Sequence, residues 1–109
     1  MAVFERLYGE NHYEIVVNLN NLANVRFARG DAQEAETLLR KAIAIKEKLL
    51  GTDHPDTVLS INNLGVILYR QGRNEEARPL FERALRDFTT RLGEAHPKTQ
   101  MARTNLEKV

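Results

Sequence analysis

The sequence predicts an all-α protein built from a repeated pair of helices, and three observations support that prediction. Histidines stand at positions 12, 54 and 96, so each lies 42 residues after the previous one. Residues 12–53 placed over 54–95 without a gap are identical at twelve positions. Within each copy, apolar residues recur at spacings of three and four, which is the pattern of a helix with one buried face.

The composition suits a helical protein and excludes several functions. The chain has 109 residues, of which 42% are hydrophobic, and it lacks cysteine, so a disulfide framework or a thiolate site is excluded. Basic and acidic residues nearly balance at a net charge of +1, which argues against a nucleic-acid or membrane-surface partner. No apolar run approaches the roughly 20 residues that a bilayer requires, and residues 1–9 lack the apolar core of a signal peptide. We therefore expect a cytoplasmic protein.

The first helix of a copy is clearest in residues 54–72. His54-Pro55 begins it, because proline suits the first helical turn, and Gln71-Gly72 ends it, because glycine accepts a left-handed turn. The predicted apolar face consists of Val58, Ile61, Leu64, Gly65 and Leu68, with Val16, Leu19, Leu22 and Ala23 in the preceding copy.

The second helix of this copy is expected to start near Asn74, which is a suitable N-cap, and to close at Leu92-Gly93. Gly30-Asp31 makes the equivalent turn in the preceding copy. The buried stripes are Ala77, Leu80, Phe81, Ala84 and Leu85, and Ala35, Leu38, Leu39, Ala42 and Ile45. Small residues recur at fixed positions, such as Ala23 and Gly65, which allows the two helices to approach closely.

We expect a single domain, 1–109, with four parts: the end of a preceding second helix (1–9), two repeats (12–51 and 54–93), and the first helix of a third repeat (96–109). On this division the chain begins and ends inside a repeat, which predicts a piece of a longer array. Such ends would leave Phe4, Leu7, Met101 and Leu106 uncovered. A second hypothesis is therefore a homo-oligomer formed through these ends.

The pattern Leu64-Gly65, Leu68, Ala77, Phe81 and Ala84 resembles the tetratricopeptide repeat family, and the spacing matches over nearly the whole chain. Two features depart from the commonest form: the period is 42 rather than about 34, and Leu19 or Ile61 stands where tryptophan is frequent. The period, the His-Pro opening and the Asn-Asn-Leu run are similar to the cargo-binding repeats of kinesin light chain. The resemblance implies a right-handed α-α superhelix, a scaffold or adaptor that binds a protein or peptide, no enzymatic activity and no cofactor.

Helical geometry places a line of residues opposite the buried face of each first helix, since a helix turns about 100° per residue. We call this line the asparagine strip; it consists of Val17, Asn21, Asn24 and Ala28, then Leu59, Asn63, Val66 and Arg70, then Met101, Asn105 and Lys108. Asn20, Asn62 and Thr104 lie about a quarter turn away, at its edge. Stacked repeats would align the strip into the concave wall of a solenoid.

Asparagine is a poor residue inside a helix, yet its amide can donate and accept hydrogen bonds together, as the backbone of an extended peptide requires. In the kinesin light chain repeats that this sequence resembles, such asparagines line the cargo groove. The predicted partner-binding residues are Asn21, Asn24, Asn63, Val66, Arg70, Asn105, Lys108, Asn20 and Asn62. An alternative stays open, in which these amides bond locally or to the neighbouring repeat. The cations of a chaperone-binding carboxylate clamp are missing, because Asn20 with Asn24, and Met101 with Asn105, stand at their positions.

The three histidines are the candidates for metal or acid–base chemistry. Equivalent helices are expected about 16–20 Å apart, too far for histidines to share a metal whose bonds are about 2 Å. Their place at the head of a helix predicts a capping role instead. The sequence also lacks a phosphate loop, a Ser/His/Asp set and an HExxH motif. It therefore predicts neither a catalytic nor a metal site.

Overall fold

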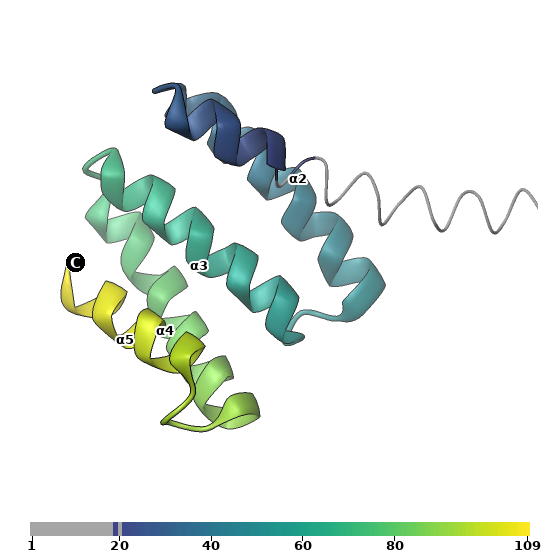
Figure 1. Ribbon diagram of the computed structural model, residues 1–109, viewed down its shortest axis with the longest axis vertical. Helices are drawn as coiled ribbons and strands as arrows, with labels where there is room; N and C mark the ends of the chain where they lie inside the picture. The colour runs from purple at the N-terminus through teal and green to yellow at the C-terminus, as the bar shows by residue number, and fades with distance from the viewer. Residues whose placement is uncertain (1–18, 20) are drawn as a thin grey trace, which may run out of the picture.

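The computed structural model describes residues 19 and 21–109, and this part of the chain consists of helices and short turns (Figure 1). Residues 21–28 are helical, and four further helices follow: α2 (Ala32–Leu50), α3 (Pro55–Arg70), α4 (Asn74–Leu92) and α5 (Pro97–Glu107). The described residues contain no strand, so the predicted all-α class is confirmed for them.

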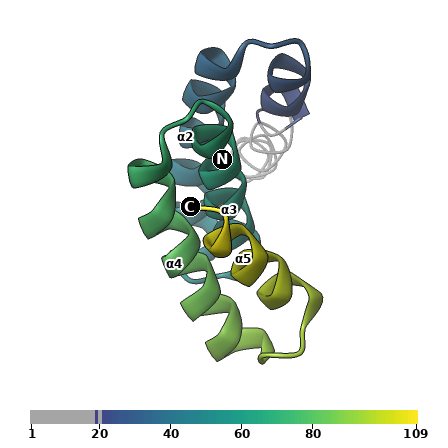
Figure 2. The same cartoon turned by 90° about the vertical axis from the view of Figure 1, so that its left-hand side faces the viewer.

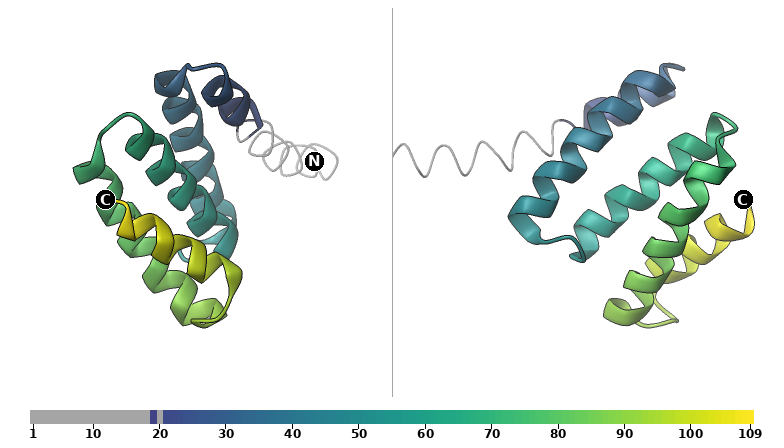
Figure 3. Two further views of the ribbon diagram at one scale, coloured as in Figure 1. Left: turned by 60° about the vertical axis from the view of Figure 1, so that its left-hand side comes forward. Right: turned by 180° about the vertical axis from the view of Figure 1, so that it is seen from behind.

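Successive helices alternate between two sides of the molecule. In Figure 1 the 21–28 helix, α3 and α5, which we call the first helices, lie toward the viewer, and α2 and α4, the second helices, lie behind them. The reverse view in Figure 3 brings α2 and α4 to the front. Figure 2 shows α4 and α5 side by side. Since α3 packs against α2, α4 and α5, it is the central helix of the described structure.

Histidine caps the two first helices that follow a connector, as the sequence predicts. The Nδ1 atom of His54 accepts the backbone N–H of Asp56 at 3.1 Å, and that of His96 accepts the backbone N–H of Lys98 at 3.1 Å. In both places the next residue is a proline at the start of the helix. His12 lies outside the described residues. The repeated histidine therefore satisfies a helix end, which is a structural role.

The turns within each helix pair contain glycine in the left-handed region, with φ of 88° at Gly30 and 78° at Gly72. Asp31 caps α2 by accepting the backbone N–H of Glu34 at 3.2 Å. The prediction that Asn74 caps α4 is wrong, because Asn74 is the first residue of the helix and Arg73 occupies the cap position. Arg73 makes no capping bond, and its guanidinium instead binds the carboxylates of Glu36 and Glu76.

The buried residues form two core clusters. The larger core cluster contains Ala23, Ala35, Leu39, Ala42, Ile43, Ile61, Leu64, Ile67, Leu68, Ala77 and Phe81. The smaller core cluster contains Val58, Ala84, Phe88 and Ala102, and joins α3, α4 and α5. The predicted apolar face of α3 is buried throughout. Phe88 is buried although it lies outside the predicted stripe, and Leu22, predicted to be buried, is 40% exposed.

The close approach of α3 and α4 depends on Gly65. A Cβ atom at Gly65 would lie 2.7 Å from a ring carbon of Phe81, closer than carbon atoms pack. Ala23 and Leu39 occupy the same repeat positions in the preceding helix pair, and both are buried. The small residues therefore act as the sequence predicts. Glycine stands where the partner is phenylalanine, and the larger alanine stands where the partner is the smaller leucine.

Candidate protein-interaction surface

One side of α3 remains accessible although the helix is central. From Thr57 onward, the residues of α3 that are not buried are Leu59, Asn63, Val66, Tyr69 and Arg70. Four of these five belong to the asparagine strip, and their spacing of three and four is that of one helical face. Asn63 is half-buried and Arg70 is exposed. The strip is thus the surface that α3 presents to solvent.

The strip continues on both neighbouring first helices. On the 21–28 helix, Asn21, Asn24 and Ala28 are exposed. On α5, Met101 and Asn105 are half-buried, and Lys108, directly after the helix, is exposed. Val17 and Asn20 lie outside the described residues. The described positions of the strip on these three helices are therefore exposed or half-buried.

Asn62 differs from the other predicted site residues because its side chain is only 1% exposed. Its Oδ1 atom accepts a hydrogen bond from Nδ2 of Asn105 at 3.2 Å, which joins α3 to α5. This bond is of the repeat-to-repeat kind that the sequence left open. It also shows that α3 and α5 lie closer together than the 16–20 Å expected from two helix spacings. Asn62 is therefore a packing residue in this structure, and Asn105 shares its amide with it.

Arg70 is held at the edge of the strip. Its guanidinium carbon lies 5.9 Å from the centre of the Phe27 ring, within the range of a cation–π contact. The contact links α3 to the 21–28 helix and leaves Arg70 exposed. Arg70 and Lys108 are the charged members of the described strip, whose residues include no acidic side chain. The strip therefore combines amides, aliphatic groups and two positive charges.

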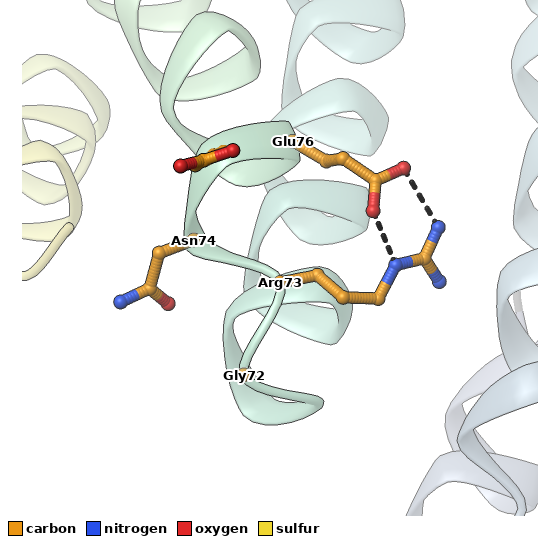
Figure 4. A pocket seen from close by; sticks show the side chains of 5 residues that line it. Gly72, Arg73, Asn74 and Glu76 are labelled. Atoms are coloured by element: carbon orange, nitrogen blue, oxygen red, sulfur yellow. Dashed lines mark hydrogen bonds and ion pairs between the residues drawn. The ribbon is translucent and has the colours of Figure 1, made fainter.

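A hollow of about 390 Å³ lies at the α3–α4 turn, lined by Gly72, Arg73, Asn74, Glu75 and Glu76 (Figure 4). Arg73 donates to Glu76 through Nη2 at 2.8 Å and also binds Glu36 on α2. Arg73 is the sole cation lining the hollow, and the carboxylates of Glu36 and Glu76 both bind it. We therefore interpret the hollow as the outline of a structural ion-pair network.

Glu36 is the centre of this network. Burial raises the pKa of its carboxyl, but hydrogen bonds from Arg73, Arg40 and Gln71 outweigh that effect and lower the pKa overall. The side chain of Glu36 is 14% exposed, whereas that of Arg73 is 35% exposed. The network joins α2 to the turn after α3, so it connects neighbouring helix pairs.

Of the four apolar residues predicted at the open ends, two lie among the described residues. Phe4 and Leu7 lie outside the described residues. Met101 and Leu106 are half-buried, and Leu106 packs against the larger core cluster. Leu106 is therefore less available than the sequence suggests.

Two further findings concern the described residues alone. Residues 19 and 21–109 contain no group of three or more His, Cys, Asp or Glu side chains placed to hold a metal ion. None of the helices in this part of the chain is long and apolar enough to cross a membrane.

The helix pairs and their repeated capping residues define a helical repeat protein. A family model described as tetratricopeptide repeat matches residues 1–48 and 14–90, and together these matches span residues 1–90 of the 109. The chain therefore belongs to the tetratricopeptide repeat family. In general this family provides protein-interaction scaffolds, and its repeats are typically not enzymes. The search of curated proteins found no match for the chain.

Proposed function

We propose that this protein is a scaffold or adaptor module that binds a peptide segment or helix of a partner protein along the asparagine strip. The observation that carries the proposal is the accessible side of α3. This central helix is buried on its other sides, whereas Arg70 is exposed and Leu59, Asn63 and Val66 are half-buried in one line. Leu59 and Val66 also pack against the core clusters, so each offers part of its side chain. Exposed and half-buried residues of the 21–28 helix and α5 extend that line.

The chemistry of the strip suits an extended peptide backbone. Asn24 and Asn63 each offer a donor and an acceptor, which can pair with a backbone carbonyl and N–H. Leu59, Val66 and Met101 provide apolar surface beside these amides. Arg70 and Lys108 favour a partner that is not positively charged, because like charges repel across an interface.

We further propose that the array is of the 42-residue kinesin-light-chain type and forms a right-handed superhelix. The repeats are 12–51 and 54–93, and 96–109 is the first helix of a third. The recurrence of the histidine cap at residues 54 and 96 supports this register.

A peptide-array screen against the chain identifies binding sequences, and isothermal titration of the best peptide tests the site. Replacing both Asn21 and Asn63 with alanine should abolish binding or weaken it by at least tenfold, while circular dichroism shows unchanged helicity. Asn74→Ala is the matched control, because this exposed asparagine lies on a second helix, and its affinity should stay at the native value.

Unchanged affinity in the Asn21/Asn63 double variant would contradict the proposed site. Light scattering at several protein concentrations separates the alternative of self-association. A mass that rises with concentration, with no array peptide bound, would favour association through the ends of the chain.

A further inference from the structure

Asn62 and Asn105 join two neighbouring first helices through their side-chain amides. Nδ2 of Asn105 donates to Oδ1 of Asn62 at 3.2 Å. Asn62 is buried, whereas Asn105 is half-buried and belongs to the asparagine strip. The bond therefore connects a buried side chain of α3 to a side chain of α5 that lies on the proposed binding surface.

The burial of Asn62 is not explained by a gain in stability. Its Nδ2 atom is buried as well and has no hydrogen-bond partner among the described residues. A buried donor without a partner costs more than one neutral hydrogen bond contributes. Val58 and Val66, four positions away on either side, show that apolar side chains fit this part of α3. Asparagine at position 62 is therefore not the residue that stability alone favours.

The bond to Asn62 fixes the orientation of the Asn105 amide. Oδ1 and Nδ2 are the two branches of one planar group, so the direction of one branch determines the direction of the other. Because Nδ2 is bound to the buried Asn62, Oδ1 lies on the branch directed away from that contact. Asn105 keeps part of its surface accessible. Its oxygen is thus the end of the amide that is left for a ligand.

An amide that is already oriented is better suited to binding than one that rotates freely. Ordering a side chain on binding costs free energy, and a second residue that holds the side chain beforehand reduces this cost. The unpaired donor of Asn62 lowers the stability of the core, but its acceptor holds Asn105 in one orientation. The benefit of Asn62 therefore lies at the surface of the strip.

We propose that Asn62 is a positioning residue of the asparagine strip, which turns Oδ1 of Asn105 toward a backbone N–H group of the bound peptide. Asn62 contacts no ligand itself and acts through the Asn105 amide. This role rests on the proposed function of the strip and adds what its α5 end recognises, a donor N–H group. Replacing Asn62 should consequently change binding and stability in different directions.

Two variants with the branched shape of asparagine separate the two effects. Asn62→Leu removes both the acceptor and the unpaired donor. Its urea midpoint should be unchanged or higher, and its affinity for the best array peptide should fall at least about fivefold. Asn62→Asp keeps an acceptor for Asn105, so its affinity should stay within about twofold of the native value, although the buried carboxyl group lowers its urea midpoint. Asn62→Ala repeats the removal with a smaller side chain in case leucine does not fit.

Thr57→Val is the matched control. Thr57 is also a buried polar residue of α3, and its hydroxyl likewise has no hydrogen-bond partner among the described residues. Valine has the shape of threonine, so the variant should have an unchanged or higher urea midpoint and native affinity. A loss of affinity as large as that of Asn62→Leu would overturn the proposal, because any change in the core of α3 would then weaken binding.

Side-chain amide resonances of the free chain test the positioning without a partner. The exchange of the Asn105 Nδ2 protons with water should be at least about threefold faster in Asn62→Leu than in the native chain. Array peptides N-methylated at one backbone nitrogen at a time locate the recognised N–H group. One analogue should bind the native chain at least about fivefold more weakly than the unmodified peptide, and Asn62→Leu should bind the two peptides equally.

The outcomes distinguish this role from the proposed function. Native affinity in Asn62→Leu, with binding lost in the Asn21/Asn63 double variant, would overturn the positioning role and leave the binding surface in place. Native affinity in both variants would contradict the binding surface and the positioning role together. Weaker binding by Asn62→Leu with unchanged exchange at Asn105 would also overturn the proposal, since it indicates a general effect on packing.

Discussion

The two described helix pairs fill the same repeat positions with different residues. Between the 21–28 helix and α2, Ala23 and Leu39 are buried at the positions that Gly65 and Phe81 occupy between α3 and α4. Between α2 and α3, Lys46 and Ser60 stand at the repeat positions that Phe88 and Ala102 occupy between α4 and α5. The difference shows that the repeat conserves the volume shared by two partners, while the size and polarity of each partner can change. Variants that exchange residues between equivalent positions test this interpretation.

The largest effect is expected from Phe88→Lys. This variant places a lysine, the residue found at the equivalent position between α2 and α3, in the apolar core between α4 and α5. The variant should lose about 3–5 kcal/mol of unfolding free energy, because it removes a buried ring and brings an ammonium into the smaller core cluster. Urea unfolding followed by circular dichroism measures the loss. Adding Ala102→Ser should recover part of it, since Ser60 supplies the equivalent acceptor. A loss below about 1 kcal/mol would show that position 88 tolerates charge as position 46 does.

Gly65→Ala tests the pairing of small and large residues between helices. The added methyl group would meet the Phe81 ring, so we expect a loss of about 1–3 kcal/mol despite the better helix propensity of alanine. The double variant Gly65→Ala/Phe81→Leu copies the Ala23–Leu39 pair. It should be more stable than the sum of the two single variants predicts, and additive losses would contradict the pairing.

Glu36→Gln tests the ion-pair network that Glu36 of α2 forms. The equivalent position of α4 carries Arg78 instead of an acid. The hydrogen bonds around Glu36 hold the pKa of its carboxyl below the ordinary value. Its contribution to stability is therefore fully present above the unfolded-state pKa and is lost as the pH falls through the folded-state pKa. At about pH 7 the variant should lose about 1–2 kcal/mol. Near pH 3 the difference from the native chain should shrink.

Urea titrations at both pH values measure this change, and Glu82→Gln at an exposed site of α4 is the control. A difference between the native chain and Glu36→Gln that stays constant with pH would show that ionised Glu36 contributes nothing.

The smallest effect is expected at the helix caps. His54→Ala removes the acceptor for the backbone N–H of Asp56 and should cost about 0.5–1 kcal/mol, whereas His54→Asn keeps an acceptor and should cost less. The same two replacements at His96 compare α5 with α3. Thermal unfolding midpoints give the order, and equal stability of the alanine and asparagine variants would remove the capping role.

The sequence predicts much of this fold because helix periodicity and the 42-residue register are local properties. They place the described helices, the histidine caps of α3 and α5, and the accessible line on α3. The Asn74 cap was missed by one position, and helix ends are where sequence patterns are least precise.

The remaining features depend on contacts between distant residues. Asn62 has the same residue type as Asn63, and only the position of α5 shows that it pairs with Asn105. The Glu36–Arg73 pair and the burial of Lys46 beside Ser60 likewise depend on how helices pack across a junction. Phe88 has a phenylalanine two periods earlier, at position 4, but the intervening copy carries Lys46, so the repeat alone does not predict an apolar residue at this position.

The central functional claim is that the asparagine strip is the binding surface. Side-chain amide resonances report it directly when the best array peptide is titrated into the isotope-labelled chain. We predict shifts in the amides of Asn21, Asn24 and Asn63, with Asn74 on α4 unchanged. Shifts confined to Asn74 and the outer faces of α2 and α4 would place the partner on the second helices and contradict the proposed surface.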